Sequence, residues 1–288
     1  MSVLLSHFGE AVETHGRAHY QMMFKAALVA GGTAGYIVDA SMSSGTPKYN
    51  AYAGPELTAT PLIGGGNAGV YAGPFEAGLV KHLVSWNAQM SQAPAWVRLL
   101  DYLLCYPLID GDSTGAQVMV NASGLPRHTT GAGVRAMLVS FAPMTAAATV
   151  SYSYTNSEGV AGRTATGAVV PAGLGGVVVS AAVPSNGTAV STSNVCTPYL
   201  PLEGGDTGIR SVESVTFNSS PGGFMTLVLV KPLAQLAVLE AGVTAEHAFG
   251  MDSTSFPQVS EGAYLQCIAQ IASASASSLV SAFLFANV

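Results

Sequence analysis

The chain has 288 residues, of which 49% are hydrophobic and only 9% are charged. Soluble domains usually carry roughly 25% charged residues. The 10 basic and 16 acidic residues give a net charge of -6, so no basic surface can neutralise several phosphates, and a nucleic-acid partner is excluded. High hydrophobicity with little charge also excludes intrinsic disorder.

The mean hydropathy of +0.40 makes a membrane protein worth testing. A spanning helix needs about 20 consecutive apolar residues, whereas the apolar runs here, such as 225–230, have the length of strands. We therefore expect no membrane partner. The first ten residues lack the basic and apolar segments of a secretory signal, which predicts synthesis in a cytoplasm. Cys105, Cys196 and Cys267 form no C-x-x-C pair, and we expect reduced, buried thiols.

The N-terminal segment has helical spacing over residues 4–29. Glu10 and Glu13 lie early in this segment, where the helix dipole favours acids, although Gly9 and Gly16 weaken the prediction. The apolar and histidine positions that recur at steps of three and four are Leu4, Leu5, Phe8, Val12, His15, His19, Met22 and Met23.

Residues 31–78 are rich in Gly, Pro, Ala and Tyr. Pro47, Pro55, Pro61 and Pro74 interrupt any long helix, and no apolar run is long enough for a central strand. A structureless stretch of this length is uncommon inside a compact domain. We expect an extended arm that lies on a partner or packs as short strands against neighbouring subunits.

From residue 79 onward the pattern changes to short strands separated by turns, and residues 149–155 alternate strictly between Val or Tyr and Thr or Ser. This organisation predicts a mainly β fold, an antiparallel β-sandwich or jelly roll over residues 79–288, after an N-terminal helix and arm over residues 1–78. For residues 96–104 a buried helix is the alternative to a strand. The predicted strands are 82–90, 96–108, 134–141, 149–155, 163–170, 176–183, 209–218, 224–230, 264–271 and 279–286.

One motif resembles a hydrolase signature. Gly111-Asp-Ser113-Thr-Gly115 matches G-x-S-x-G, and Asp206 and His247 follow in the order Ser, Asp, His. A nucleophile elbow requires a helix after the serine, but the residues after Gly115 are strand-like. In a glycine-rich chain this match arises readily by chance, so we interpret it as a turn.

Two other motifs resemble ligand-binding loops. Asp110 and Asp112 have the spacing found at the start of a calcium-binding loop. The twelfth position of such a loop would be Asn121, where a bidentate glutamate is required. Residues 64–69 fit G-x-G-x-x-G without a preceding strand or a βαβ unit, and no P-loop lysine exists. We interpret both as turns, with no cofactor.

Histidines, carboxylates and aromatics give no stronger signal. His15 and His19 have the i,i+4 spacing that can share a metal ion, yet no H-E-x-x-H motif accompanies them. No spacing singles out a pair of acids. The sequence predicts no catalytic, cofactor-binding or metal-binding residue and no enzyme. Aromatics that could line a sugar site, but are more often core, are Trp86, Trp96, Tyr199 and Phe256.

Charge is also unevenly distributed. No charged residue occurs between Arg163 and Glu203, or after Glu261. Outward positions of strands in these segments must therefore be uncharged, as in the core of an obligate interface. We expect residues 164–202 and 262–288 to be the least exposed in an assembled particle. The alternative is a compact neutral domain without such contacts.

Two turns have candidate structural pairs. Asp206 and Arg210 flank a turn into a strand, where local pairing would fix the turn. Arg163 opens the strand that follows a hairpin whose tip is residues 156–159.

Several segments resemble structural proteins of tailed-bacteriophage virions, over residues 81–288. They are LPRHTTGAGVRAMLV (125–139), VSYSYTNSEGVAGRT (150–164), YLPLEGGDTGIRSVESV (199–215) and the closing segments EGAYL (261–265) and AFLFAN (282–287). The resemblance implies a non-enzymatic capsid decoration, cement or head-fibre protein. It implies the virion as its location, and the major capsid protein and further copies of itself as its partners, with a homotrimer as the unit.

Two alternatives remain open. A head-to-tail adaptor or fibre-base protein would occur in far fewer copies per particle. A carbohydrate-binding or esterase module would use the aromatics or Ser113.

Overall fold

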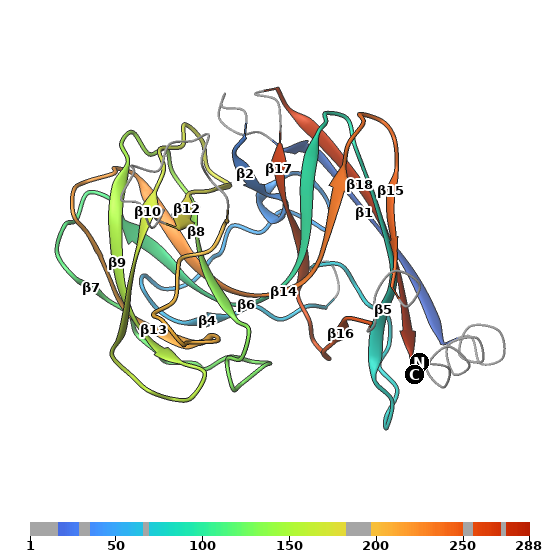
Figure 1. Cartoon of the computed structure of the whole chain (residues 1–288), viewed down its shortest axis with the longest axis horizontal. Helices are drawn as coiled ribbons and strands as arrows, with labels where there is room; N and C mark the ends of the chain where they lie inside the picture. Colours follow the sequence, from blue (N-terminus) through green and yellow to red (C-terminus); the bar gives the residue numbers. More distant parts are fainter. Residues whose placement is uncertain (1–16, 29–34, 66–68, 183–196, 250–255, 272–274) are drawn as a thin grey trace.

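The computed structural model describes residues 17–28, 35–65, 69–182, 197–249, 256–271 and 275–288 (Figure 1). Among these residues the regular structure is almost entirely β, and the helical part is one short 3-10 turn, η1 (Ala40–Met42). The strands pair antiparallel throughout, which confirms the predicted fold class. Within these ranges no helix is long and apolar enough to cross a membrane.

Each of the ten predicted strand segments contains a strand, and the helical alternative for residues 96–104 is wrong. The segment 176–183 divides into two short strands, and the segment 224–230 extends to residue 238. The strands are β5 (Lys81–Met90), β6 (Ala95–Asp110), β8 (Arg135–Ser140), β9 (Ala148–Asn156), β10 (Arg163–Val169), β11 (Val177–Val178), β12 (Ser180–Ala182), β13 (Ile209–Phe217), β14 (Phe224–Val238), β17 (Leu265–Ile271) and β18 (Ser277–Asn287).

The predicted N-terminal helix is wrong where the structure describes it. Residues 18–28 form strand β1 (Ala18–Leu28), while residues 4–16 of the predicted helix lie outside the described residues. Its side chains also alternate with period two, because Met23 and Lys25 are buried and Met22 and Phe24 are exposed. Pairing with β18 along most of its length selects this second periodicity.

The described part of the Gly/Pro-rich segment packs against the rest of its own chain. It contains three short strands, of which β2 is a central one. Tyr36, Val38, Tyr52, Leu62 and Val70 are buried in the core. The expectation of short strands is confirmed, but they join the sheets of the same chain. The strands of this segment are β2 (Ile37–Asp39), β3 (Gly45–Thr46) and β4 (Thr60–Pro61).

Three further short strands lie outside the ten predicted segments. They are β7 (Gln117–Val118), β15 (Ala245–Ala248) and β16 (Gln258–Val259).

Three sheets build the molecule. The terminal sheet has the order β15-β5-β18-β1-β3, with β16 also paired to β5. The hairpin sheet has the order β12-β10-β9-β13-β7. The closed sheet runs β14-β8-β11-β2-β17-β6 and returns to β14, because β14 pairs with both β8 and β6, and β4 adds to its β6 side.

A long ribbon of β6 and β14 connects the two halves of the molecule. Figure 1 shows the terminal sheet beside β17 in one half and the hairpin sheet beside β8 in the other, with β6 and β14 running between them. The ribbon changes register at three places, which bends it. Pro232 sits at one of them, beyond Val230, the last residue of β14 that pairs with β8, so its missing N–H costs no bond to that strand. One continuous core joins both halves.

Candidate functional site

The structure does not bring the candidate triad together. Ser113 lies in the turn after β6, and the short strand β7 follows it where a hydrolase needs a helix. Asp206 belongs to the half of the molecule that contains the hairpin sheet. His247 lies in β15 of the terminal sheet, at the opposite side in Figure 1, and its ring stacks on Phe249 with centroids 4.1 Å apart.

The calcium-like loop is closed by its own hydrogen bonds. Asp110 accepts from the backbone N–H of Asp112 at 2.9 Å, and Asp112 accepts from Ser220 at 2.9 Å. Asn121 points elsewhere, because its amide oxygen accepts from the Tyr106 hydroxyl at 2.7 Å. Within the described part of the chain, no three His, Cys, Asp or Glu side chains gather to hold a metal ion.

The other candidate residues are dispersed. His15 is outside the described residues, and His19 packs edge-on against Tyr71 with ring centroids 5.3 Å apart. Trp86 is buried in the core, while Trp96 is 46% exposed on β6. These positions do not converge on one surface as a sugar site requires. Phe256 lies beside His82, and Tyr199 packs against the core.

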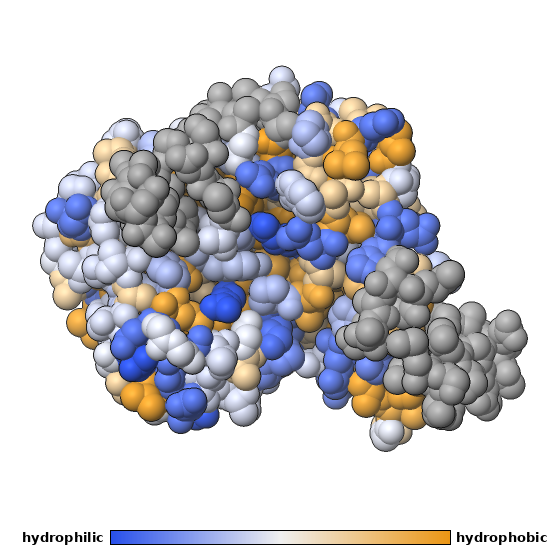
Figure 2. All heavy atoms as spheres, in the orientation of Figure 1, coloured by the Kyte–Doolittle hydropathy of each residue, from blue (hydrophilic) through white to orange (hydrophobic). Residues whose placement is uncertain are grey.

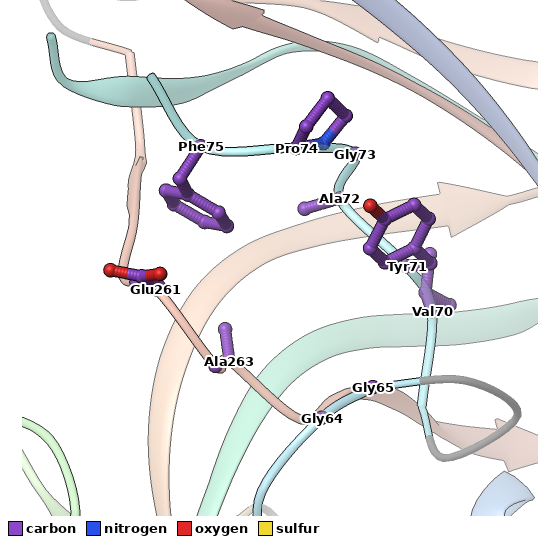
Figure 3. Close-up of a pocket in the computed structure, with 11 residues that line it drawn as sticks. Gly64, Gly65, Val70, Tyr71, Ala72, Gly73, Pro74, Phe75, Glu261 and Ala263 are labelled. Atoms are coloured by element: carbon purple, nitrogen blue, oxygen red, sulfur yellow. The ribbon is translucent and has the colours of Figure 1, made fainter. Parts of the chain in front are cut away.

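A surface cavity of about 330 Å³ lies between the segments 64–75 and 261–263 (Figure 3). Part of the glycine motif lines it, namely Gly64 and Gly65, whereas residues 66–68 lie outside the described residues. Figure 3 shows Tyr71, Phe75 and the Glu261 carboxylate around the opening. Its described lining residues include an acid and no basic side chain, so the cavity suits a small apolar or cationic group and not a phosphate.

Lys81 supports one wall of this cavity. Its ammonium lies 4.5 Å from the centroid of the Phe75 ring, a cation–π contact. It also donates to the Ala72 carbonyl at 2.9 Å and to the Pro74 carbonyl at 2.5 Å. These bonds fix the segment 72–75, so the amine has a structural role.

A buried carboxylate lies at the centre of the closed sheet, at the end of β2. Asp39 is fully buried and accepts from the Tyr52 hydroxyl, from the Tyr102 hydroxyl at 2.9 Å and from the Ser41 N–H at 2.8 Å. Burial raises the pKa of Asp39, and these hydrogen bonds partly oppose the rise. No local sequence pattern signals this cluster, because Asp39 and Tyr102 are 63 residues apart.

Lys25 is buried on the inner face of β1. Its ammonium donates to the Ser43 carbonyl at 3.2 Å and to the Pro47 carbonyl at 2.6 Å. Burial lowers the pKa of Lys25 from 10.5 to about 8, while the charge on Asp39 acts in the opposite direction. Lys25 therefore remains protonated at neutral pH, and its buried ammonium holds the backbone at Ser43 and Pro47 against β1.

Replacing Lys25 with methionine should change how stability depends on pH. The folded chain binds the Lys25 proton more weakly than the unfolded chain, so this residue makes the wild type more stable as pH rises from about 8 to 10.5. The free energy of unfolding of the wild type, relative to Lys25→Met, should rise by up to about 3 kcal/mol over this range. Urea titrations of both proteins at pH 7, 9 and 10.5 measure it. A constant difference would contradict the burial argument.

Arg127 and Asp101 form a buried ion pair. The Arg127 and Asp101 side chains are only 5% and 2% exposed, and two bonds of 2.6 and 3.0 Å join them. Arg127 also donates to the carbonyls of Leu62 at 3.0 Å and Tyr102 at 2.7 Å. Asp101 accepts from the Tyr264 N–H at 3.0 Å. The pair thereby ties the loop between β7 and β8 to β6, to the segment after β4 and to the residue before β17.

The predicted pairing of Asp206 with Arg210 is wrong. Asp206 accepts from Tyr154 at 2.6 Å, from Asn156 at 2.8 Å and from Arg163 at 3.1 Å. These bonds, led by the one from Tyr154, lower the pKa of Asp206 to about 2. The carboxylate reaches across to β9 and β10 because the turn brings it over their ends.

Arg210 instead holds neighbouring backbone. Its guanidinium donates to the Ser157 carbonyl at 2.7 Å and to the Thr130 carbonyl at 3.1 Å. Arg163 does begin β10 after the predicted hairpin tip. It completes a network with Glu203 at 3.0 Å. All these charges act within the fold.

The uncharged C-terminal segment has an explanation inside the single chain. Strand β17 lies between β2 and β6, and β18 lies between β5 and β1. Both strands are mostly buried. Their lack of charge therefore follows from a central position, whether or not a partner also covers them. In the segment 164–202, residues 183–196 lie outside the described residues.

Large apolar side chains remain exposed at many other places. Figure 2 shows apolar residues reaching the surface in several patches on the face in view. The large apolar residues that are exposed are Tyr20, Met22, Phe24, Tyr49, Ile63, Tyr71, Val80, Trp96, Val118, Val120, Phe141, Val160, Leu174, Phe224, Leu239 and Val243.

The prediction of reduced, buried cysteines is confirmed for Cys105 and Cys267, which are free and buried. Cys196 lies outside the described residues.

Comparison with known proteins identifies no family. No protein-family model and no curated protein match the chain. Among solved structures, an infectious bursal disease virus VP2 subviral particle is 8% identical, with 94% of this chain and 81% of that chain covered, at a TM-score of 0.19. T=1 particles derived from infectious bursal virus are 9% identical, with 93% and 77% covered, at 0.19. Likenesses at such scores identify neither a shared fold nor a shared function.

Proposed function

We propose that this chain is a non-enzymatic structural protein of a tailed-bacteriophage virion that decorates or cements the capsid. The observation that carries the proposal is a surface with few charges and many exposed large apolar side chains. Free monomers rarely expose extensive apolar surface, and interface cores are depleted in charge. The resemblance of residues 81–288 to virion structural proteins supports the virion as the location and the capsid as the partner in this proposal.

A structural role also fits how the polar side chains are used. The buried pair of Arg127 with Asp101, the Asp39 cluster and the Asp206 network each satisfy backbone or tyrosine groups within the fold. Nothing in the geometry around Ser113 favours the esterase alternative. The proposed unit is a homotrimer, as the resemblance implies, assembled in the host cytoplasm.

Purified protein should bind capsids that lack it. The expected result is co-sedimentation of hundreds of copies per particle, with no binding to capsids that already carry it. Cryo-electron microscopy of the reconstituted particles gives the copy number and the position. Protein that stays in the supernatant at every concentration contradicts the proposal, and a dozen or fewer copies per particle supports a head-to-tail adaptor instead.

A further inference from the structure

Within the part of the chain that the structure describes, strand β1 has an unpaired hydrogen-bonding edge along its first half. On one side β1 pairs with β18 from Ala18 to Leu28. On the other side its pairing with β3 is confined to Phe24 and Lys25. Among the described residues no strand pairs with this side between Ala18 and Met23.

The direction of the backbone groups on this edge follows from the alternation of a strand. Ala26 donates its N–H to the Ser44 carbonyl on the β3 side, whereas the Arg17 carbonyl accepts from Asn287 on the β18 side. Even-numbered residues therefore direct their N–H and C=O groups to the free edge. Ala18, Tyr20 and Met22 present these groups. The Met22 carbonyl also accepts from the Gln21 side-chain amide at 3.0 Å, which leaves the second lone pair of this carbonyl oxygen free.

The side chains at this edge are apolar and uncharged. Tyr20 is 73% exposed and Met22 is 62% exposed, on the outer face of the terminal sheet. They lie next to Leu284 and Ala282 of β18, which are half-buried. Natural proteins usually protect an open edge with charges, proline or a bulge. None of these devices occurs between residues 18 and 23.

We propose that the free edge of β1 pairs antiparallel with the β1 edge of a second copy of this chain, about a two-fold axis at Tyr20. The uncharged edge brings no like charges together when it meets itself. Pairing centred on Tyr20 places Ala18 opposite Met22 of the second copy and forms roughly six backbone hydrogen bonds. If the two-fold axis lay at Gln21, whose backbone groups point to β18, the pairing would form roughly four backbone hydrogen bonds.

The contact makes one continuous sheet from two terminal sheets and buries Tyr20 and Met22 of both copies. A two-fold contact cannot close a trimer, so in the proposed assembly it joins two homotrimers. The inference deepens the proposed self-assembly and rests on it. Its tests measure contacts between purified chains, so they can fail or succeed independently of capsid binding.

The first test is disulfide cross-linking in a Cys196→Ser background, where Cys105 and Cys267 are buried. Tyr20→Cys places two thiols at the axis with Cα atoms about 5.5 Å apart, within disulfide range. Met22→Cys places its thiols about 13 Å apart along the edge, too far to link. We expect a covalent dimer from Tyr20→Cys at least ten times more abundant than from Met22→Cys.

Val118→Cys is the matched control, because Val118 is 67% exposed on β7, which also ends a sheet. Random collisions link this control at the background rate. Equal cross-linking of Tyr20→Cys and Val118→Cys overturns the proposal.

The second test places charge on the axis. Tyr20→Lys sets two ammonium groups opposite each other, and its wild-type side chain is too exposed for its loss to unfold the chain. The mass measured by light scattering should fall to half that of the wild type, while Val118→Lys keeps the wild-type mass. A wild type that is monomeric or only trimeric at tens of micromolar, or an unchanged Tyr20→Lys mass, overturns the proposal.

Discussion

Replacing Arg127 with alanine should lower the free energy of unfolding by about 3–5 kcal/mol. The substitution leaves the Asp101 carboxylate buried without its cation, and it removes the donors to the Leu62 and Tyr102 carbonyls. Urea denaturation measured by tryptophan fluorescence gives the change, with an unchanged m-value as evidence of a single transition.

The matched control is Arg163→Ala. Arg163 also bonds to two acids, but its side chain is 27% exposed. Exposed ion pairs contribute about 0–1 kcal/mol, so this variant should stay close to the wild type. The double variant Arg127→Met with Asp101→Leu should recover part of the loss, because no buried charge is left unpaired. Equal losses in Arg127→Ala and Arg163→Ala would contradict the role assigned to burial.

The strands were predictable where alternation extends over several residues and turns separate them. Residues 149–155 of β9 are the clearest case, with Val150, Tyr152 and Tyr154 all buried. Strands of two or three residues, such as β2 and β7, are too short to show any period. β15 has the sequence Ala-Glu-His-Ala, which has little strand propensity and forms by pairing with β5.

The N-terminal strand and the polar clusters could not be predicted from the sequence, for two different reasons. In residues 18–28 helical spacing and period-two alternation coexist, and only the partner strand β18 decides between them. The Asp39 and Arg127 clusters join residues that are distant in sequence, such as Arg127 and Asp101, 26 positions apart. A single sequence contains no local pattern for such contacts. Asp206 likewise paired with Arg163, 43 positions away, and not with the nearer Arg210.

The scarcity of charge consequently has two sources. In residues 262–288 it reflects central strands that the chain itself buries. At the β1 edge it concerns side chains that the chain leaves exposed, such as Tyr20 and Met22. The proposed contact between two β1 edges would explain the second source, whereas burial within the fold already accounts for the first.

Replacing Trp86 with alanine should lower the free energy of unfolding by about 3–5 kcal/mol. Trp86 of β5 is fully buried between the terminal and closed sheets. Its ring lies nearly parallel to Phe283 of β18, with centroids 6.0 Å apart, and its indole N–H donates to Ser281 at 3.3 Å. The substitution opens a cavity that the surrounding strands cannot close, because backbone pairing fixes β5 against β18.

Trp96→Ala makes the same chemical change at a residue that is 46% exposed on β6. It should cost less than about 1 kcal/mol, because nearly half of the residue already contacts water and its loss leaves no enclosed cavity. Since each variant retains one tryptophan, circular dichroism at increasing urea follows both without relying on fluorescence. Equal losses of stability in the two variants would contradict the role assigned to the burial of Trp86.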